Sequence, residues 1–273
     1  MPASLEQIVA TTRRKVAETR RTADRQELER KAELHVPRGF RRALESQARS
    51  GPAVIAELKK TSPSRGLIRA DFDAGKLAAE LEGAGAAALS VLTDAEFFQG
   101  SLQNLQLASA ATKLPCLRKD FMVNEFQLLE ARAHGADAVL LIVAALSPAE
   151  MNRLAKQAGE YCLDVLCEVH DEGELQRAID SGCDLIGVNS RDLRTFQVDL
   201  QTAFRLAEQI PSSVVRIAES GIQSGADMAR LRAAGYHAFL IGEALMKAKS
   251  PGEALRELLT SERVLALNPE VAR

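Results

Sequence analysis

The chain has 273 residues, and its 35 basic and 37 acidic side chains give a formal net charge of −2. A near-neutral chain is a poor candidate for binding nucleic acid or an anionic membrane as its main ligand. The composition, 46% hydrophobic and 26% charged, excludes intrinsic disorder, and 4% aromatic residues with no Trp argue against base-stacking or sugar-stacking sites. The length allows one or two domains.

The N-terminal 50 residues differ from the rest in charge, with 12 basic and 7 acidic residues giving +5 and leaving −7 for residues 51–273. Pro37 and Gly39 mark a break before a short helix over residues 40–48. The segment before the break predicts a helical stripe, formed by Leu5, Ile8, Val9, Val16 and Leu28. We therefore expect residues 1–50 to be an N-terminal helical extension packed on a barrel of residues 51–273, as one structural domain. Its Arg-rich run fits a solvated helix face or an anion-binding arm.

After Gly51, short apolar runs alternate with helical segments at intervals of about 20 to 35 residues, which is typical of βα units. Several helical segments open with Ser or Asp and close with Gly, as helix caps do. These are Ser147 to Gly159, Asp171 to Gly182 and Ser224 to Gly235. The apolar runs predict eight strands: Ala53–Leu58, Ala87–Thr93, Leu114–Phe121, Ala138–Val143, Leu163–Val169, Asp184–Ser190, Val214–Ser220 and Ala238–Gly242.

The predicted strands are apolar without strict alternation, as in a parallel sheet covered by helices. Eight βα units without a GxGxxG fingerprint favour an α/β fold of the (βα)8 TIM-barrel type over a doubly wound open sheet. The segment of residues 60–66, after the first strand, reads as a polar loop.

Four cysteines occur without a CxxC pair and without His at metal-ligand spacing, so we expect neither a disulfide framework nor a metal site. The first 21 residues carry charge where a secretory signal needs an apolar run, and no stretch reaches the ~18 apolar residues of a membrane span. We therefore expect a reduced, cytoplasmic protein.

In a barrel of this kind the site lies at the C-terminal ends of the strands. Polar side chains end or follow most of the predicted strands: Glu57, Lys59, Arg118, Lys119, Asp120, Glu168, His170, Asn189, Arg191, Glu219, Ser220 and Glu243. Such a mouth could transfer protons on an anionic substrate, and we expect burial to raise the pKa of a carboxyl group and to lower that of an ammonium group. For any one of these residues, a water-exposed ion pair is the alternative.

Glycines follow the last two strands, at Gly221 and Gly242, where they let backbone N–H groups approach an anion. A short helix beginning near Glu243 would add the positive end of its dipole, so we expect one phosphate group there. GxxxxGK[ST] is absent, which leaves nucleotide binding without support.

Several motifs occur in chain order over nearly the whole length: ELKKTSPS (57–64), RADFD (69–73), SVLTDAEFFQGS (90–101), LRKDF (117–121), LLIV (140–143), CEVHDE (167–172), GVNSRDL (187–193), AESGI (218–222) and FLIGEALM (239–246). Together they resemble the indole-3-glycerol phosphate synthase family of the tryptophan pathway. The combination of ExKxxSPS with RKDF carries most of the specificity.

The resemblance implies that 1-(2-carboxyphenylamino)-1-deoxyribulose 5-phosphate is converted to indole-3-glycerol phosphate, CO2 and water, with neither metal nor organic cofactor. Lys119 is similar to the family's general acid and Glu168 to its general base. Lys59 would hold the substrate carboxylate and assist protonation, while Glu57 and Asn189 would orient hydroxyl and ammonium groups.

The remaining implied contacts fall into two sets. Phe98, Phe121 and Leu140 would surround the anthranilate ring, although Leu140 also fits a core position. The phosphate and ribulose would be surrounded by Ser62, Ser220, Gly221, Gly242 and Glu243, in a mouth that also contains Arg191 and Glu219. Because a carboxylate beside a phosphate dianion would repel it, we expect Glu243 to act through its backbone N–H.

Two alternatives remain. One is a phosphate-binding barrel isomerase similar to phosphoribosylanthranilate isomerase, although such enzymes use Cys or Asp on the first strand, where this chain has Glu57 and Lys59. The other is a non-catalytic barrel subunit. We expect the protein to be a monomer that binds an anionic phosphorylated small molecule. We expect it to bind neither nucleic acid nor membrane.

Overall fold

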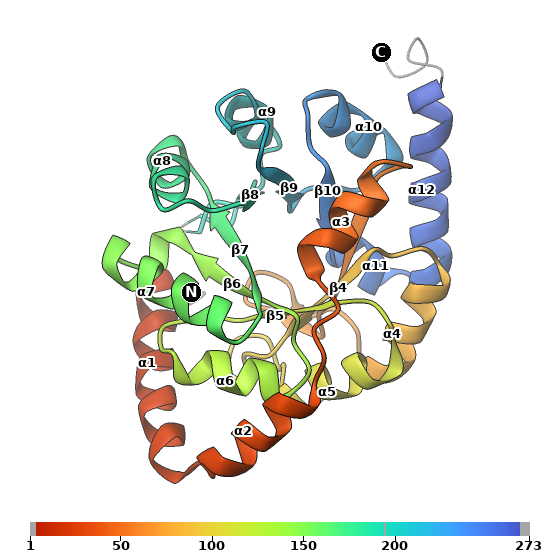
Figure 1. Cartoon of the computed structure of the whole chain (residues 1–273). Helices are drawn as coiled ribbons and strands as arrows, with labels where there is room; N and C mark the ends of the chain where they lie inside the picture. Colours follow the sequence, from red (N-terminus) through yellow and green to blue (C-terminus); the bar gives the residue numbers. More distant parts are fainter. Residues whose placement is uncertain (1–3, 194, 268–273) are drawn as a thin grey trace.

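The computed structural model describes residues 4–193 and 195–267. They form a closed barrel of eight parallel strands that is surrounded by helices, and three N-terminal helices precede the first strand (Figure 1). This confirms the predicted TIM-barrel fold, and each barrel strand lies within the run predicted for it. The strands are β1 (Ala53–Leu58), β4 (Ala88–Leu92), β5 (Cys116–Lys119), β6 (Ala138–Ile142), β7 (Asp164–Val169), β8 (Leu185–Asn189), β9 (Val215–Glu219) and β10 (Ala238–Ile241). The pairing of β1 with both β4 and β10 closes the barrel.

The helices between the strands begin with the caps that the sequence predicts. The side chains of Ser147, Asp171 and Ser224 each accept a hydrogen bond from the backbone N–H three residues later. The helices are α4 (Ala74–Gly83), α5 (Leu102–Ala111), α6 (Phe126–Ala133), α7 (Pro148–Glu160), α8 (Glu172–Asp180), α9 (Gln201–Ala207), α10 (Gly225–Ala233), α11 (Glu243–Lys247) and α12 (Pro251–Leu267), with a 3-10 turn, η1 (Val143–Ala145).

Three local predictions were wrong. Helix α7 continues past Gly159, because Cys162 rather than that glycine takes the left-handed conformation (φ 53°) that ends the segment. Residues 60–66 were expected to be a plain loop, but strands β2 (Thr61–Ser62) and β3 (Gly66–Leu67) pair there as an antiparallel hairpin. Cys167 of β7 and Cys183 form a disulfide, because the turn before β8 returns the chain beside β7.

The N-terminal segment forms α1 (Leu5–Thr22), α2 (Arg25–Leu34) and α3 (Phe40–Ala48). The predicted stripe is therefore two helices: the chain is extended at Ala23, and Asp24 caps α2 by accepting from the backbone N–H of Glu27. Helix α3 has the bounds that the sequence predicts. No helix among residues 4–193 and 195–267 is both long and apolar enough to cross a bilayer.

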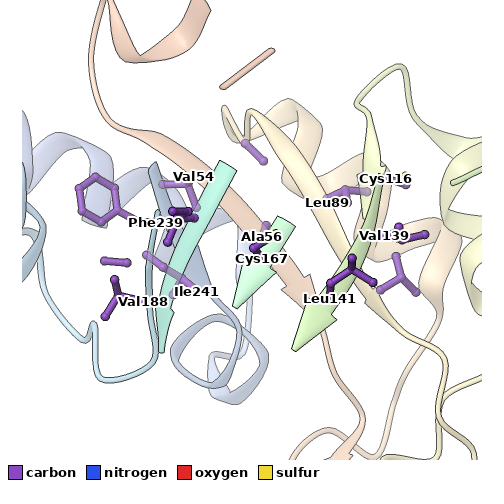
Figure 2. Close-up of a cluster of buried hydrophobic side chains, with 14 of the residues drawn as sticks. Val54, Ala56, Leu89, Cys116, Val139, Leu141, Cys167, Val188, Phe239 and Ile241 are labelled. Atoms are coloured by element: carbon purple, nitrogen blue, oxygen red, sulfur yellow. The ribbon is translucent and has the colours of Figure 1, made fainter. Parts of the chain in front are cut away.

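Alternate residues of each strand face opposite sides of the barrel wall, and each side has its own core. One core lies between strands and helices, and Figure 2 labels some of its members: Val54, Ala56, Leu89, Cys116, Val139, Leu141, Cys167, Val188, Phe239 and Ile241. The other core fills the barrel interior and includes Ile55, Leu117, Leu166 and Ile217. Phe40 and Leu44 of α3 belong to the interior core, so α3 closes the barrel at its N-terminal end.

Asp137 joins the N-terminal segment to this closed end. Its carboxylate is buried and accepts hydrogen bonds from the backbone N–H of Cys116 (2.7 Å), the backbone N–H of Arg38 (2.7 Å) and Arg38 Nε (2.9 Å). Arg38 also donates to Ser109 and to the carbonyl oxygens of Thr112 and Gly135. These contacts support the proposal that the N-terminal helices and the barrel form one domain.

We expect Arg38→Ala to lower the free energy of unfolding by about 3 to 5 kcal/mol, because it leaves the buried Asp137 carboxylate without its cation. Urea denaturation followed by circular dichroism measures this loss. Arg25→Ala is the control: it removes an exposed pair with Glu29 and is expected to cost about 1 kcal/mol or less. Equal losses in the two variants would contradict the anchoring role of Arg38.

Candidate active site

A cavity of about 510 Å³ opens at the C-terminal ends of the strands. All the predicted catalytic and binding residues line it: Glu57, Lys59, Ser62, Phe98, Lys119, Phe121, Leu140, Glu168, Asn189, Arg191, Glu219, Ser220, Gly221, Gly242 and Glu243. The structure therefore brings the whole predicted set together, from the eight barrel strands and the segments that follow them.

The convergence follows from the strand pleat. Ile55, Leu117, Leu166 and Ile217 face the barrel interior, and two residues further along the same strands come Glu57, Lys119, Glu168 and Glu219. Side chains two residues apart share a face, so each strand places an apolar group inside the barrel and a charged group at its mouth. The apolar layer below excludes water from the floor of the cavity.

Lys119 lies at the centre of this charged group. Its Nζ donates to Glu168 Oε2 at 2.9 Å and to Glu219 Oε2 at 3.3 Å. Lys59 Nζ lies 2.6 Å from Glu57 Oε1, and Asn189 Nδ2 donates to Glu168 Oε1 at 3.2 Å. The three carboxylates are almost fully buried, with 1 to 4% exposed.

The pKa of Lys119 is raised, whereas the sequence argument expected an ammonium pKa to fall. Burial does oppose the charged form, but the three carboxylates Glu168, Glu219 and Glu57 outweigh it. Lys119 is therefore charged at neutral pH and can act as a cationic hydrogen-bond donor.

The carboxyl groups separate into two kinds. Burial acts to raise the pKa of both Glu168 and Glu57. Lys119 and His170 nevertheless lower the pKa of Glu168 below the ordinary range, and Lys59 is the main group that lowers the pKa of Glu57. The pKa of Glu219 shifts the other way, as the sequence argument expected for one carboxyl group. Burial raises it to about 8; the negative charges of Glu168 and Glu57 also raise it, and Lys119 opposes them. The site thus holds an ionised carboxylate and a protonated carboxyl group that both contact one ammonium group.

Gly187 makes the position of Glu219 possible, and the sequence argument missed it. A Cβ atom on this β8 glycine would collide with Glu219 Oε1. Gly242 similarly leaves room for Glu57, since a Cβ there would lie 2.5 Å from Glu57 Oε1. A glycine two residues before the inward Asn189 is the sequence signal that could have revealed this contact.

The end of the cavity that contains the predicted phosphate residues is rich in cations. Ser220 and Gly221 both have positive φ, 64° and 80°, in the turn after β9. The carboxylate of Glu243 lies 2.6 Å from Lys247 Nζ, 3.2 Å from Arg65 Nε and 3.6 Å from Arg191 NH2. The sequence argument did not single out Arg65 or Lys247, because neither lies at the end of a strand.

Apolar side chains also line the cavity. The rings of Phe98 and Phe121 lie with their centroids 6.4 Å apart and tilted by 39°, and Leu140 is buried among the interior residues. Leu5 and Ile8 of α1 also line the cavity. Their contribution was missed because the spacing of a helical stripe does not say which surface it covers.

Among the described residues, no three His, Cys, Asp or Glu side chains are placed to hold a metal ion. The carboxylates of the cavity contact ammonium, imidazole or amide groups instead. The arrangement can donate a proton or hydrogen bond from Lys119 and accept a proton at Glu168.

Comparisons with known sequences identify relatives of this chain. The sequence model of the indole-3-glycerol phosphate synthase family matches residues 5–258. An indole-3-glycerol phosphate synthase of Koribacter versatilis (strain Ellin345) is 58% identical over 259 residues, which cover 95% of this chain and 100% of that protein.

Solved structures also share the fold. Thiamine phosphate pyrophosphorylase from Pyrococcus furiosus has a TM-score of 0.58 at 17% identity, over 78% of this chain and 96% of that one. KGPDC from Streptococcus mutans has a TM-score of 0.58 at 13% identity, over 78% and 98%. At such low identity these two structures bear on the barrel fold alone.

Glu219→Gln tests the raised pKa. Between pH 4.5 and about 8 the folded protein keeps a proton on Glu219 that the unfolded chain releases, so Glu219 lowers stability as the pH rises. We expect the variant to exceed wild type in thermal midpoint by at least about 3 °C at pH 9 and by much less at pH 5. Glu208→Gln, at an exposed position after α9, is the control and should show no such difference. An equal effect of Glu219→Gln at both pH values would contradict the shift.

Proposed function

The chain belongs to the indole-3-glycerol phosphate synthase family of decarboxylating lyases in tryptophan biosynthesis, and we propose that Lys119 is its general acid and Glu168 its general base. The substrate is then 1-(2-carboxyphenylamino)-1-deoxyribulose 5-phosphate, and the products are indole-3-glycerol phosphate, CO2 and water. The contact between Lys119 Nζ and Glu168 Oε2, 2.9 Å at the floor of the cavity, is the observation that most supports this assignment.

Ring closure is the step in which Lys119 acts. A neutral ketone is a poor electrophile for a ring carbon, and an ammonium group on its oxygen stabilises the negative charge that develops there. Because its pKa is raised, Lys119 is charged before the substrate binds. The ketone oxygen replaces one of the two carboxylates as a partner of the ammonium group.

Decarboxylation follows from the product of ring closure. Closing the ring leaves an iminium group, which accepts the electron pair of the breaking carbon–carboxylate bond, so the aromatic ring is restored as CO2 leaves. Lys59 holds the carboxylate until this point, and Glu57, 2.6 Å from Lys59 Nζ, fixes the position of that ammonium group. The step has its electron sink in the substrate, so it needs neither a metal ion nor an organic cofactor.

Dehydration needs an acid and a base on opposite sides of the new ring. Lys59, directly after β1, assists the departure of the hydroxyl group, and Glu168 on β7 takes the proton that is lost. Asn189 Nδ2 donates to Glu168 Oε1 at 3.2 Å, which leaves Oε2 as the oxygen that faces Lys119.

The phosphate group binds at the cation-rich end of the cavity. Backbone N–H groups after Glu219 and Gly242 and the side chains of Arg191 and Ser62 contact it or the ribulose chain, with Ser220 beside them. Ser62 Oγ is buried without a hydrogen-bond partner among the described residues, so it is free to bond to a ligand. Phe98, Phe121 and Leu140 enclose the anthranilate ring.

Two further parts of the proposal rest on the sequence: the protein is cytoplasmic, and it is a monomer. Sedimentation velocity measures the second directly, since a single species near the 29.6 kDa of the chain is expected.

The purified protein is expected to convert the ribulotide to a fluorescent indole product without added metal and with full activity in EDTA. The steps above transfer protons only between substrate and side chains, which is the reason for this expectation. Fluorescence at the indole wavelength follows the reaction. Absence of indole formation by folded protein would refute the proposed function.

Lys119→Ala is expected to lower kcat by at least about two decades with KM little changed, as for the loss of a positioned acid. Lys113→Ala is the matched control, because Lys113 precedes the same strand and its side chain is exposed; its kcat should equal that of wild type. A Lys119→Ala variant with near-normal turnover would show that Lys119 only binds the substrate.

A further inference from the structure

His170 lies at the end of β7, two residues after Glu168, and contacts two carboxylates at once. Its Nδ1 lies 2.9 Å from Glu174 Oε2, which also accepts the backbone N–H of His170 at 2.9 Å. Its Nε2 lies 3.2 Å from Glu168 Oε1. The imidazole is 11% exposed, and the side chains of Glu168 and Glu174 are 3% and 13% exposed. Nε2 is buried without an aligned hydrogen bond, so charge carries its interaction with Glu168.

We propose that His170 is a positioning residue for Glu168: held as a cation by Glu174, it determines that Glu168, and not Glu219, is the ionised carboxylate beside Lys119. The proposal rests on the proposed role of Glu168 as the general base.

The charges in the cavity explain why such a residue is needed. Three buried carboxylates, Glu57, Glu168 and Glu219, face two ammonium groups, and Glu57 is paired with Lys59. Lys119 lies between the other two, at 2.9 and 3.3 Å. One ammonium group cannot neutralise both, so one carboxyl group keeps a proton at neutral pH. The two distances to Lys119 are too similar to decide which one.

The asymmetry comes from the far side of Glu168. His170 and Asn189 both face Glu168 Oε1. Glu219 Oε1, in contrast, is buried without a hydrogen-bond partner, against Gly187. A positive charge on His170 therefore stabilises the ionised form of Glu168 alone, and the proton stays on Glu219.

Glu174 keeps His170 charged. A buried imidazole without a partner is neutral, but Glu168 from β7 and Glu174 from α8 outweigh burial and raise the pKa of His170 to about 10. Beyond His170, the charged groups that interact with Glu168 are Lys119 of β5, Glu219 of β9 and Glu57 of β1. His170 is absent from the cavity lining, so it acts through Glu168 rather than on the substrate.

The first test is the protonation of His170, followed by NMR of the imidazole nitrogens against pH. In wild type we expect the imidazolium signal to persist to at least about pH 9, and in Glu174→Gln we expect it to titrate between about pH 6 and 8. Glu172→Gln is the matched control: Glu172 is exposed in the same first turn of α8 and pairs with Arg205, and its variant should resemble wild type. A wild-type His170 that titrates below pH 8, or a Glu174→Gln variant that resembles wild type, would overturn the proposal.

The second test is the pH dependence of turnover in His170→Gln, which keeps an amide near the Nε2 position and removes the charge. Without the cation the pKa of Glu168 rises, so the base is protonated as the pH falls. We expect the kcat of His170→Gln at pH 6 to be about tenfold below its kcat at pH 9. At pH 9 its kcat should be within about twofold of the wild-type value, and its KM should be unchanged. The kcat of wild type should not fall in this way below pH 7. The same is expected of the control variant His134→Gln, which removes another partly buried histidine.

These outcomes separate three possibilities. A loss of kcat in His170→Gln that is equal at every pH would show a merely structural role and overturn the proposal, as would no loss at all. A wild-type protein that forms no indole would instead refute the proposed function, while the NMR titration would still report whether Glu174 keeps His170 charged.

Discussion

The buried contact of Lys119 with Glu168 and Glu219 is the interaction on which the rest of the site depends. Transfer of an ammonium group and a carboxylate from water to a barrel interior is costly unless each meets the other at hydrogen-bond distance. The distances of 2.9 and 3.3 Å satisfy this requirement for Lys119. They also leave one carboxylate too many, and this excess forces the pKa values of Glu168 and Glu219 apart. The ionised carboxylate of Glu168, the proposed general base, and the protonated carboxyl group of Glu219 arise from the same imbalance.

The barrel supplies the geometry for this contact through its pleat and register. Lys119, Glu168 and Glu219 come from β5, β7 and β9, and each is the last or nearly the last inward residue of its strand. The interior core lies directly below them, and Phe40 and Leu44 of α3 close the other end. Glycine at positions 187 and 242 removes the side chains that would otherwise occupy the space of Glu219 and Glu57. The N-terminal segment thus contributes to the site in two ways: Leu5 and Ile8 of α1 line the cavity, and α3 completes the dry core on which the charges rest.

The sequence predicts the features that depend on local pattern. Strand runs, the caps at Ser147, Asp171 and Ser224, and the polar residues that end most strands are all encoded within a few positions of each other, and the structure places most of them as expected. Arg118 and His170 were also expected at the mouth of the barrel, but neither lines the cavity, and Arg118 instead donates to the carbonyl oxygen of Gln127. Features that depend on neighbours from elsewhere in the chain were missed. The rise in the pKa of Lys119 requires knowing that three carboxylates surround it. The pairing of Cys167 with Cys183 depends on how the chain after α8 returns beside β7. The hairpin of β2 and β3 is too short to give a periodic signal.

The charges of the cavity divide into two zones that match the two ends of the proposed substrate. Around the proposed phosphate position, Arg65, Arg191 and Lys247 carry three positive charges and share the single carboxylate of Glu243. The net charge of this zone, 3 − 1 = +2, suits a phosphate dianion and explains why Glu243 does not repel it. The catalytic zone, in contrast, is close to balanced, so its ammonium groups are held by carboxylates until a substrate oxygen replaces them. Binding at the phosphate end, remote from the reacting carbon, can thus supply the free energy that separates Lys119 from one of its carboxylate partners.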